Sequence, residues 1–163
     1  MMYFRGFILI CLASLVACDV ACYRENTEKC QKEWSEKHQE EMHSFCPSAP
    51  NMTACMVKSA SQCQTGFEDE AAQALLVQVL ICNPLHDYNK AVMEDKNCSF
   101  DTLIASRTCD MQKEGGLCKN LDSSRQCVNQ IFSKCSKDTQ KAFYDVYDTF
   151  INLMRKHCAY IGA

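Results

Sequence analysis

The sequence predicts an all-α protein that disulfide bonds hold together, and three observations support this fold class. Of its 163 residues, 14 are Cys, a fraction typical of disulfide scaffolds. Apolar residues recur every three to four positions along most of the chain, and no segment alternates as a strand does. Only 5 Gly and 3 Pro are present, too few for the tight turns of a β-sandwich. With 47% hydrophobic and 23% charged residues, we expect a packed core.

Residues 1–18 predict a secretory signal peptide. Arg5 precedes an apolar run over 7–17, which is shorter than the roughly 20 residues that cross a bilayer as a helix. Val16 and Cys18 are small enough for a cleavage site, so we expect one mature domain at 19–163 with 14 − 2 = 12 cysteines.

An alternative reading of the same residues remains open. Leu15-Val16-Ala17-Cys18 also resembles a bacterial lipobox, in which Cys18 is lipidated, and this too leaves twelve cysteines to pair. No later stretch is apolar enough to span a membrane.

The first half of the mature chain predicts three helices. Residues 23–45 carry a thin apolar stripe on a charged background, which indicates a helix with one buried edge. Pro47 ends this helix, and Thr53 is expected to cap a second one that runs to about Gln64. The third, 67–82, is almost wholly apolar over its second half and is predicted to be the most buried element.

The second half predicts irregular or short helical structure over 85–98, followed by three more helices. Asp101 is expected to cap a helix through about Lys113, and Gly115-Gly116 marks a loop. Further helices are predicted at about 122–135 and 138–159, the last with a clean apolar stripe.

An internal duplication is the most informative pattern. Cys46-x8-Cys55-x7-Cys63-x18-Cys82 recurs with an x22 final gap, offset by 72 residues at the first three positions and by 76 at the last. The apolar pattern of 67–77 also matches at offset 76. We therefore expect two related helical units, 22–82 and 98–158, each a short helix hairpinned to a long one about a pseudo-two-fold axis.

The cysteines are predicted to be disulfide bonded and not to form a metal or redox site. Zinc sites use close Cys pairs, whereas the closest cysteines of the mature chain have seven residues between them. Equal hairpin arms favour two of the pairs, Cys46–Cys82 and Cys118–Cys158. The full set is Cys22, Cys30, Cys46, Cys55, Cys63, Cys82, Cys98, Cys109, Cys118, Cys127, Cys135 and Cys158.

No catalytic, cofactor-binding or metal-binding constellation is recognised. His86-Asp87 lacks the surroundings of a phospholipase pair, and His38 and His43 are spaced to different sides of a helix. His157 is expected to act as a cation near a helix end. The formal net charge of −3 does not favour nucleic-acid binding.

Two sequons predict glycosylation, at Asn51 (Asn51-Met52-Thr53) and at Asn97 (Asn97-Cys98-Ser99). Each is expected in a loop or at a helix start, where a glycan projects into solvent.

The count, order and spacing of the twelve cysteines from Cys22 to Cys158, behind a signal peptide, resemble the nematode secreted domain of unknown function 19. The resemblance covers nearly the whole mature chain. It implies a secreted, extracellular protein in a family without an established activity, and therefore no catalytic residues to carry over.

The sequence is compatible with three classes of function. The leading one is a secreted, non-catalytic module that binds an extracellular protein, glycan or apolar ligand. The alternative is a carrier of lipid or another small apolar ligand, with a cavity lined by Leu75, Leu76, Val79, Phe143, Phe150 and Met154. The third, a hydrolase, requires a buried His or carboxylate pair in a cleft.

Overall fold

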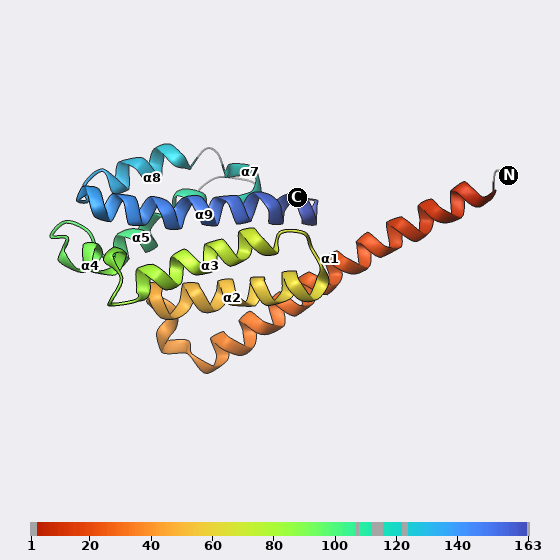
Figure 1. Cartoon of the computed structure of the whole chain (residues 1–163), viewed down its shortest axis with the longest axis horizontal. Coiled ribbons are helices and arrows are strands. Elements are labelled where there is room, and N and C mark those ends of the chain that lie inside the picture. The colour runs from red at the N-terminus through yellow and green to blue at the C-terminus, as the bar shows by residue number, and fades with distance from the viewer. Residues whose placement is uncertain (1–2, 107, 112–115, 122–123, 163) are drawn as a thin grey trace.

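A computed structural model describes the backbone of residues 3–106, 108–111, 116–121 and 124–162, and these residues contain helices and no strand (Figure 1). This confirms the all-α prediction. The helices are α1 (Tyr3–Lys37), the 3-10 helix η1 (Gln39–His43), α2 (Phe45–Cys63), α3 (Glu68–Cys82), α4 (Asp87–Glu94), α5 (Phe100–Ser106), α6 (Thr108–Met111), α7 (Gly116–Asn120), α8 (Arg125–Phe132) and α9 (Lys137–Ile161).

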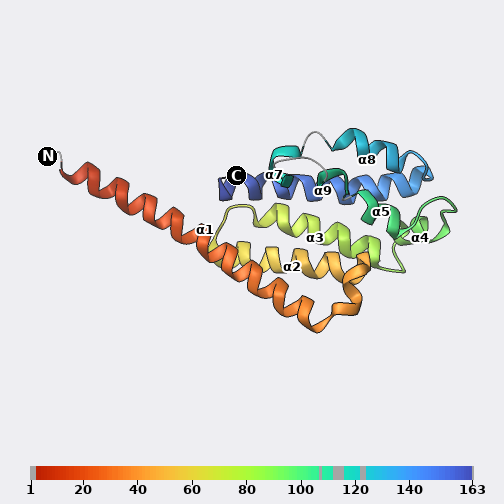
Figure 2. The same ribbon diagram turned by 180° about the vertical axis from the view of Figure 1, so that it is seen from behind.

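Three long helices form a layer at the centre of the molecule. α2, α3 and α9 lie side by side in that order, with α3 antiparallel to both neighbours (Figure 1). α8 flanks α9, and the half of α1 nearest η1 packs against α2 on the side of α2 that is away from α3 (Figure 2). Within the described residues no helix is long and apolar enough to span a membrane.

The core lies where α3 and α9 meet their neighbours. Its largest fully buried apolar side chains come from α1, the α2–α3 turn, α3, α8 and α9. They are Tyr23, Phe67, Ile81, Val128, Phe132, Phe143 and Leu153. Segments from both halves of the chain therefore share one core.

All twelve cysteines after residue 18 are bridged, and both halves use the same pairing order. In each half the first cysteine pairs with the fifth, the second with the fourth and the third with the sixth. The bonds are Cys22–Cys63, Cys30–Cys55, Cys46–Cys82, Cys98–Cys135, Cys109–Cys127 and Cys118–Cys158. The two pairs that hairpin geometry favoured are both present, and no bond joins the two halves.

Burial follows the same repeat. At offset 76, Phe67 of the α2–α3 turn corresponds to Phe143, and both are buried. At offset 72, Met56 and Ala60 of α2 correspond to the buried Val128 and Phe132 of α8. We call residues 22–82 the N-terminal unit and 98–158 the C-terminal unit. The pairing of α3 with an antiparallel α9 places the units about a pseudo-two-fold axis (Figure 1).

The expected helix lengths within each unit are only partly right. α8 with 8 residues pairs with α9 of 25 residues, as a short helix with a long one. In the N-terminal unit the 19-residue α2 is longer than the 15-residue α3. Of the predicted Gly115-Gly116 loop, Gly115 lies outside the described residues, whereas Gly116 is the first residue of α7 and is not in a loop.

The sequence prediction places the start of α2 too late. α1 ends at Lys37 rather than near residue 45, and α2 begins at Phe45. Thr53 is buried inside α2 and is not its cap. Pro47 occupies the first turn, where a backbone N–H has no partner within the helix, so only Pro50 interrupts the hydrogen-bond ladder.

Ser99 is the residue that caps α5. The hydroxyl of Ser99 accepts a hydrogen bond from the backbone N–H of Asp101 at 3.2 Å, and the backbone N–H of Ser99 donates to the hydroxyl of Thr102 at 3.1 Å. The prediction that Asp101 caps this helix is therefore wrong, and the helix starts two residues earlier than expected, at Phe100.

The prediction that α3 is the most buried element is also wrong. Among its residues only Ala71, Ala74, Gln78 and Ile81 are buried. Leu76 and Val79 expose 56% and 48% of their surface. α3 has neighbours on two sides, α2 and α9, and its outer face is uncovered within the described chain.

Candidate functional site

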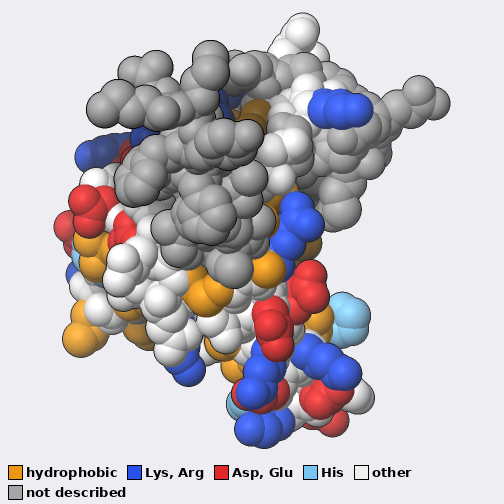
Figure 3. Space-filling view, turned by 90° about the vertical axis from the view of Figure 1, so that its right-hand side faces the viewer, with side chains coloured by type: hydrophobic (Ala, Val, Ile, Leu, Met, Phe, Trp, Pro, Cys, Tyr) orange, Lys and Arg blue, Asp and Glu red, His pale blue; other side chains and the backbone are white. Residues whose placement is uncertain are grey.

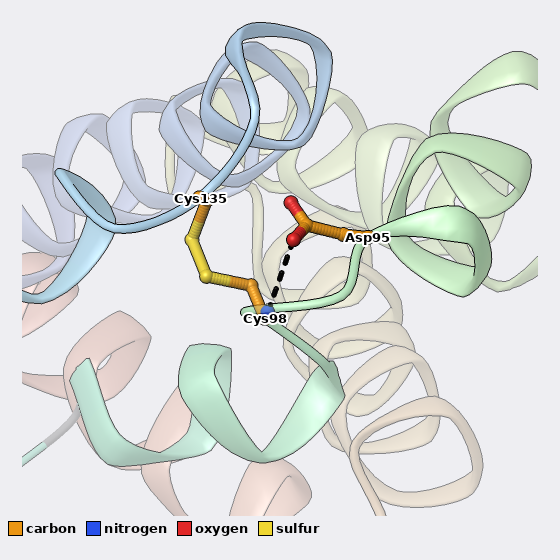
Figure 4. A group of neighbouring side chains, drawn as sticks. All are labelled: Asp95, Cys98 and Cys135. Atoms are coloured by element: carbon orange, nitrogen blue, oxygen red, sulfur yellow. Dashed lines mark hydrogen bonds between the residues drawn. A yellow bond between two sulfur atoms is a disulfide. The ribbon is translucent and has the colours of Figure 1, made fainter.

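The only group of potential metal ligands in the described residues is not a metal site. A carboxylate oxygen of Asp95 and the sulfurs of Cys98 and Cys135 lie within 4.8 Å of one another. The two sulfurs are joined in a disulfide bond (Figure 4), so neither is a thiolate that binds an ion.

Asp95 instead joins the segment between the two units to the turn between α8 and α9. Its Oδ1 accepts hydrogen bonds from the backbone N–H groups of Asn97 at 2.8 Å and Cys98 at 3.1 Å, and its Oδ2 accepts one from Ser136 at 2.8 Å. Figure 4 draws the bond from Cys98. Burial alone raises the pKa of this carboxyl, but the hydrogen bonds from the backbone N–H groups of Asn97 and Ser136, with those of the Thr139 and Ser136 hydroxyls, lower it to about 2. Asp95 therefore stays ionised and fixes the start of α9.

Of the four histidines, His38 and His86 make structural contacts and His43 is exposed. His38 lies 3.1 Å from Glu41 and stacks on Trp34, with ring centroids 5.1 Å apart. The Nδ1 atom of His86 accepts a hydrogen bond from the backbone N–H of Tyr88 and so caps α4. His43 is exposed at the end of η1.

His157 is the fourth, and it sits in an aromatic cluster where α1 meets α9. Its Nδ1 lies 3.2 Å from the hydroxyl of Tyr23, and the rings of Phe67 and Tyr160 complete the cluster. Burial, with a smaller contribution from Arg24, lowers the pKa of His157. The prediction of a cation at the helix end is therefore wrong: at neutral pH this imidazole is uncharged. Burial also raises the pKa of Tyr23 to about 12.

The sequons lie in different surroundings. Asn51 is exposed on α2, but its side-chain amide donates to the carbonyl oxygen of Pro47 at 2.7 Å and its sequon partner Thr53 is buried. Asn97 lies in the loop before α5, where Asn97 and Ser99 are both exposed.

The residues proposed to line a ligand cavity do not gather around one space. Phe143 and Met154 are buried in the core, whereas Leu76 and Val79 are exposed on the outer face of α3. The remaining two, Leu75 and Phe150, are partly buried.

That outer face of α3 carries an apolar stripe. Ala72, Leu76 and Val79 recur at spacings of four and three and are exposed, with the partly buried Leu80 beside them. Residues at this spacing share one side of a helix. Cys82 bonds Cys46 of α2 and therefore marks the side of α3 that faces α2. The stripe lies on the solvent-exposed side of α3, adjacent to the side marked by Cys82.

α2 extends the stripe across the neighbouring helix. At about 100° per residue, the solvent side of α2 next to Cys46 consists of Pro50, Ala54, Val57 and Ser61, all partly or fully exposed. We call these four residues with Ala72, Leu76, Val79 and Leu80 the α2–α3 face. Charge lies at the end of the face next to the α2–α3 turn, on Lys58 of α2 and on Glu68 and Asp69 of α3. Figure 3 views another side, where acidic and basic atoms mix over the end of α1.

The C-terminal unit shows that the fold does not require an apolar face at this place. Leu76, Val79 and Leu80 correspond at offset 76 to Asn152, Arg155 and Lys156. The equivalent surface, which we call the α8–α9 face, is polar or charged throughout its described part: Gln126, Asn129, Ser133, Asp148, Asn152, Arg155 and Lys156.

Sequence reasoning did not find the α2–α3 face, because it assigned the apolar residues of 74–81 to the core. A signal was present in the repeat itself. At offset 76 the buried positions of α3 match apolar or aromatic residues, while Leu76 and Val79 match polar ones, which marks these two as surface positions.

Comparison with known proteins places the chain in no group: no family model, curated protein or solved structure matches it. The resemblance to the nematode domain therefore stays a prediction.

Proposed function

We propose that the chain is a secreted, non-catalytic binding module, and that the α2–α3 face is its binding surface. The observation that carries the proposal is the difference between two equivalent surfaces of one repeated fold. Apolar area exposed to water costs about 25 cal/mol per Å² relative to burial. An exposed apolar face beside a polar counterpart is typical of an interaction surface.

Rigidity supports the same function. Six disulfide bonds hold α1 to α2, α2 to α3, and the matching elements of the C-terminal unit. A surface fixed before binding loses little conformational entropy when a partner docks. The bridges also fit an oxidising, extracellular setting.

The chemistry of the described residues offers less support for a hydrolase. His86 caps a helix, His38 pairs with Glu41 on the surface, and the buried His157 contacts Tyr23 rather than a carboxylate. None of the three is placed beside a nucleophile and a second acid or base, as catalysis of this kind requires.

A binding experiment on native secretions tests the proposal. The immobilised mature protein should retain a partner that is lost with Leu76→Glu/Val79→Glu and kept with the matched control Asn152→Glu/Arg155→Glu. Equal retention by both variants would refute the role of the α2–α3 face. The carrier alternative makes a different prediction: solvent extraction of the purified protein should yield a lipid in stoichiometric amount.

A further inference from the structure

The composition of the α2–α3 face indicates what kind of partner covers it. The face holds Ala, Ser, Pro, Val and Leu, with no aromatic residue and no Arg. Binding surfaces for unrelated proteins are enriched in Trp, Tyr and Arg, and helices that lie on membranes carry aromatic and basic residues. Small and aliphatic side chains are instead typical of closely packed helices. The partner is therefore helical and apolar in the region of contact.

The charged residues at one end of the α2–α3 face indicate which apolar, helical partner binds it. Lys58 and Asp69 are both exposed, and neither has an ion-pair partner among the described residues. Glu68, also in the first turn of α3, adds a second carboxylate at this end. A cation on α2 and anions on α3 at the same end of one face make that face complementary to itself.

The positions of these charges define a geometry. Lys58 lies near the end of α2 and Asp69 in the first turn of α3, so both are next to the turn at 64–67. Consider a two-fold axis that runs parallel to the helices, above the face and midway between α2 and α3. This axis places α2 of one copy against α3 of the other copy, and the two helices are antiparallel. Lys58 then lies over the turn of α3 that holds Asp69 of the partner subunit.

We infer that the α2–α3 face binds a second copy of this chain, in a symmetric dimer whose centre is a four-helix arrangement of α2, α3 and their two counterparts. This rests on the proposed function, since it names the partner of the same face. Isologous contacts of this kind are the commonest in homo-oligomers. In the dimer Leu76 packs near Ala54 of the partner subunit, at the middle of the contact.

Apolar contact and charge can be tested separately by sedimentation of the purified, oxidised mature protein. A two-helix contact is small, so we expect a dimer with Kd on the order of 10 µM. Leu76→Glu/Val79→Glu should raise Kd by at least about 100-fold, because it buries charge in an apolar contact. The matched pair on the α8–α9 face, Asn152→Glu/Arg155→Glu, should leave Kd within about threefold.

The charge pair has its own readout. Lys58→Asp and Asp69→Lys should each raise Kd about five- to tenfold, and the double exchange Lys58→Asp/Asp69→Lys should restore it to near the native value. The native Kd is recovered by the double exchange only if residue 58 of one copy contacts residue 69 of the other copy. Circular dichroism and a non-reducing peptide map verify that every variant is folded.

Two results would overturn the dimer. One is a wild-type protein that stays monomeric at about 500 µM, far above the expected Kd. The other is a dimer that both double-glutamate variants weaken equally. A monomer that still loses its partner from secretions through Leu76→Glu/Val79→Glu would leave the proposed function standing and reject only the second copy as occupant.

Discussion

The hydroxyl of Tyr23 and the Nδ1 atom of His157 lie 3.2 Å apart, so the start of the predicted mature chain contacts the last turns of α9. Phe67 from the α2–α3 turn packs edge-on against Tyr23, with ring centroids 5.2 Å apart. One aromatic cluster thus joins the N-terminal unit to the end of the C-terminal unit, where no disulfide bond does so.

This cluster should make the folded state sensitive to mild acid. The folded-state pKa of His157 is lowered by burial and by Arg24 from its usual value of 6.5, so the unfolded chain binds the proton more readily. The stabilising contribution is then fully present above pH 6.5 and is lost as the pH falls below that value. We expect the melting temperature of the wild type to drop between pH 7 and pH 5.

His157→Gln provides the comparison, because Gln has no titrating group and keeps a polar atom near Tyr23. Its melting temperature should fall less over the same pH range, and His43→Gln, at an exposed site, should follow the wild type. Parallel pH profiles for wild type and His157→Gln would show that this imidazole has no part in acid sensitivity.

Asp95→Asn should destabilise the protein by about 1–3 kcal/mol, the range for hydrogen bonds to charged groups. Its carboxylate accepts from three backbone N–H groups, and an amide presents a donor to one of them. Since the pKa of Asp95 is lowered to about 2 from its usual value of 3.8, its contribution to stability is complete above pH 3.8 and is lost as the pH falls through 2.

Urea titrations at pH 7 and pH 2 measure this effect. The difference between wild type and Asp95→Asn should shrink at the lower pH, while the exposed Asp101→Asn should match the wild type at pH 7. An Asp95→Asn variant as stable as the wild type at pH 7 contradicts the assigned role.

Gln78→Met should stabilise the protein by about 1 kcal/mol. Gln78 is 3% exposed, and its Oε1 atom has no hydrogen-bond partner, so folding removes this atom from water without compensation. The equivalent residue of α9 is Met154. Gln73→Met on the exposed side of α3 is the control and should change the free energy of unfolding by much less; a loss of stability in Gln78→Met would point to a polar contact of Gln78.

Glycan occupancy should be higher at Asn97 than at Asn51. The sequon of Asn97 lies in an exposed loop, whereas helix formation in α2 engages the amide of Asn51 and buries Thr53. Glycopeptide mass spectrometry of the secreted protein measures both sites, with Asn51→Gln and Asn97→Gln to assign the mass shifts. Higher occupancy at Asn51 would mean that transfer precedes the folding of α2.

The sequence predicts the architecture well because cysteine spacing and apolar period are local signals. Both favoured disulfide pairs follow from equal hairpin arms, and the two units follow from the offsets of 72 and 76. It misplaces the start of α2, since Pro47 reads as a helix breaker although a first turn tolerates it. It also misreads Leu76 and Val79, because an apolar residue of a core and one of a binding face look alike until the neighbours of α3 are known.

Removing the Cys118–Cys158 bridge should lower the free energy of unfolding more than removing the Cys109–Cys127 bridge of the same unit. Cys118 and Cys158 are 40 residues apart and Cys109 and Cys127 are 18 apart, so the first bridge restricts the unfolded chain more. Loop-closure entropy gives a difference of about 0.7 kcal/mol between the paired alanine variants. Chemical denaturation of Cys118→Ala/Cys158→Ala and Cys109→Ala/Cys127→Ala measures it. The reverse order would mean that native packing around Cys109, which is 4% exposed, outweighs chain entropy in this unit.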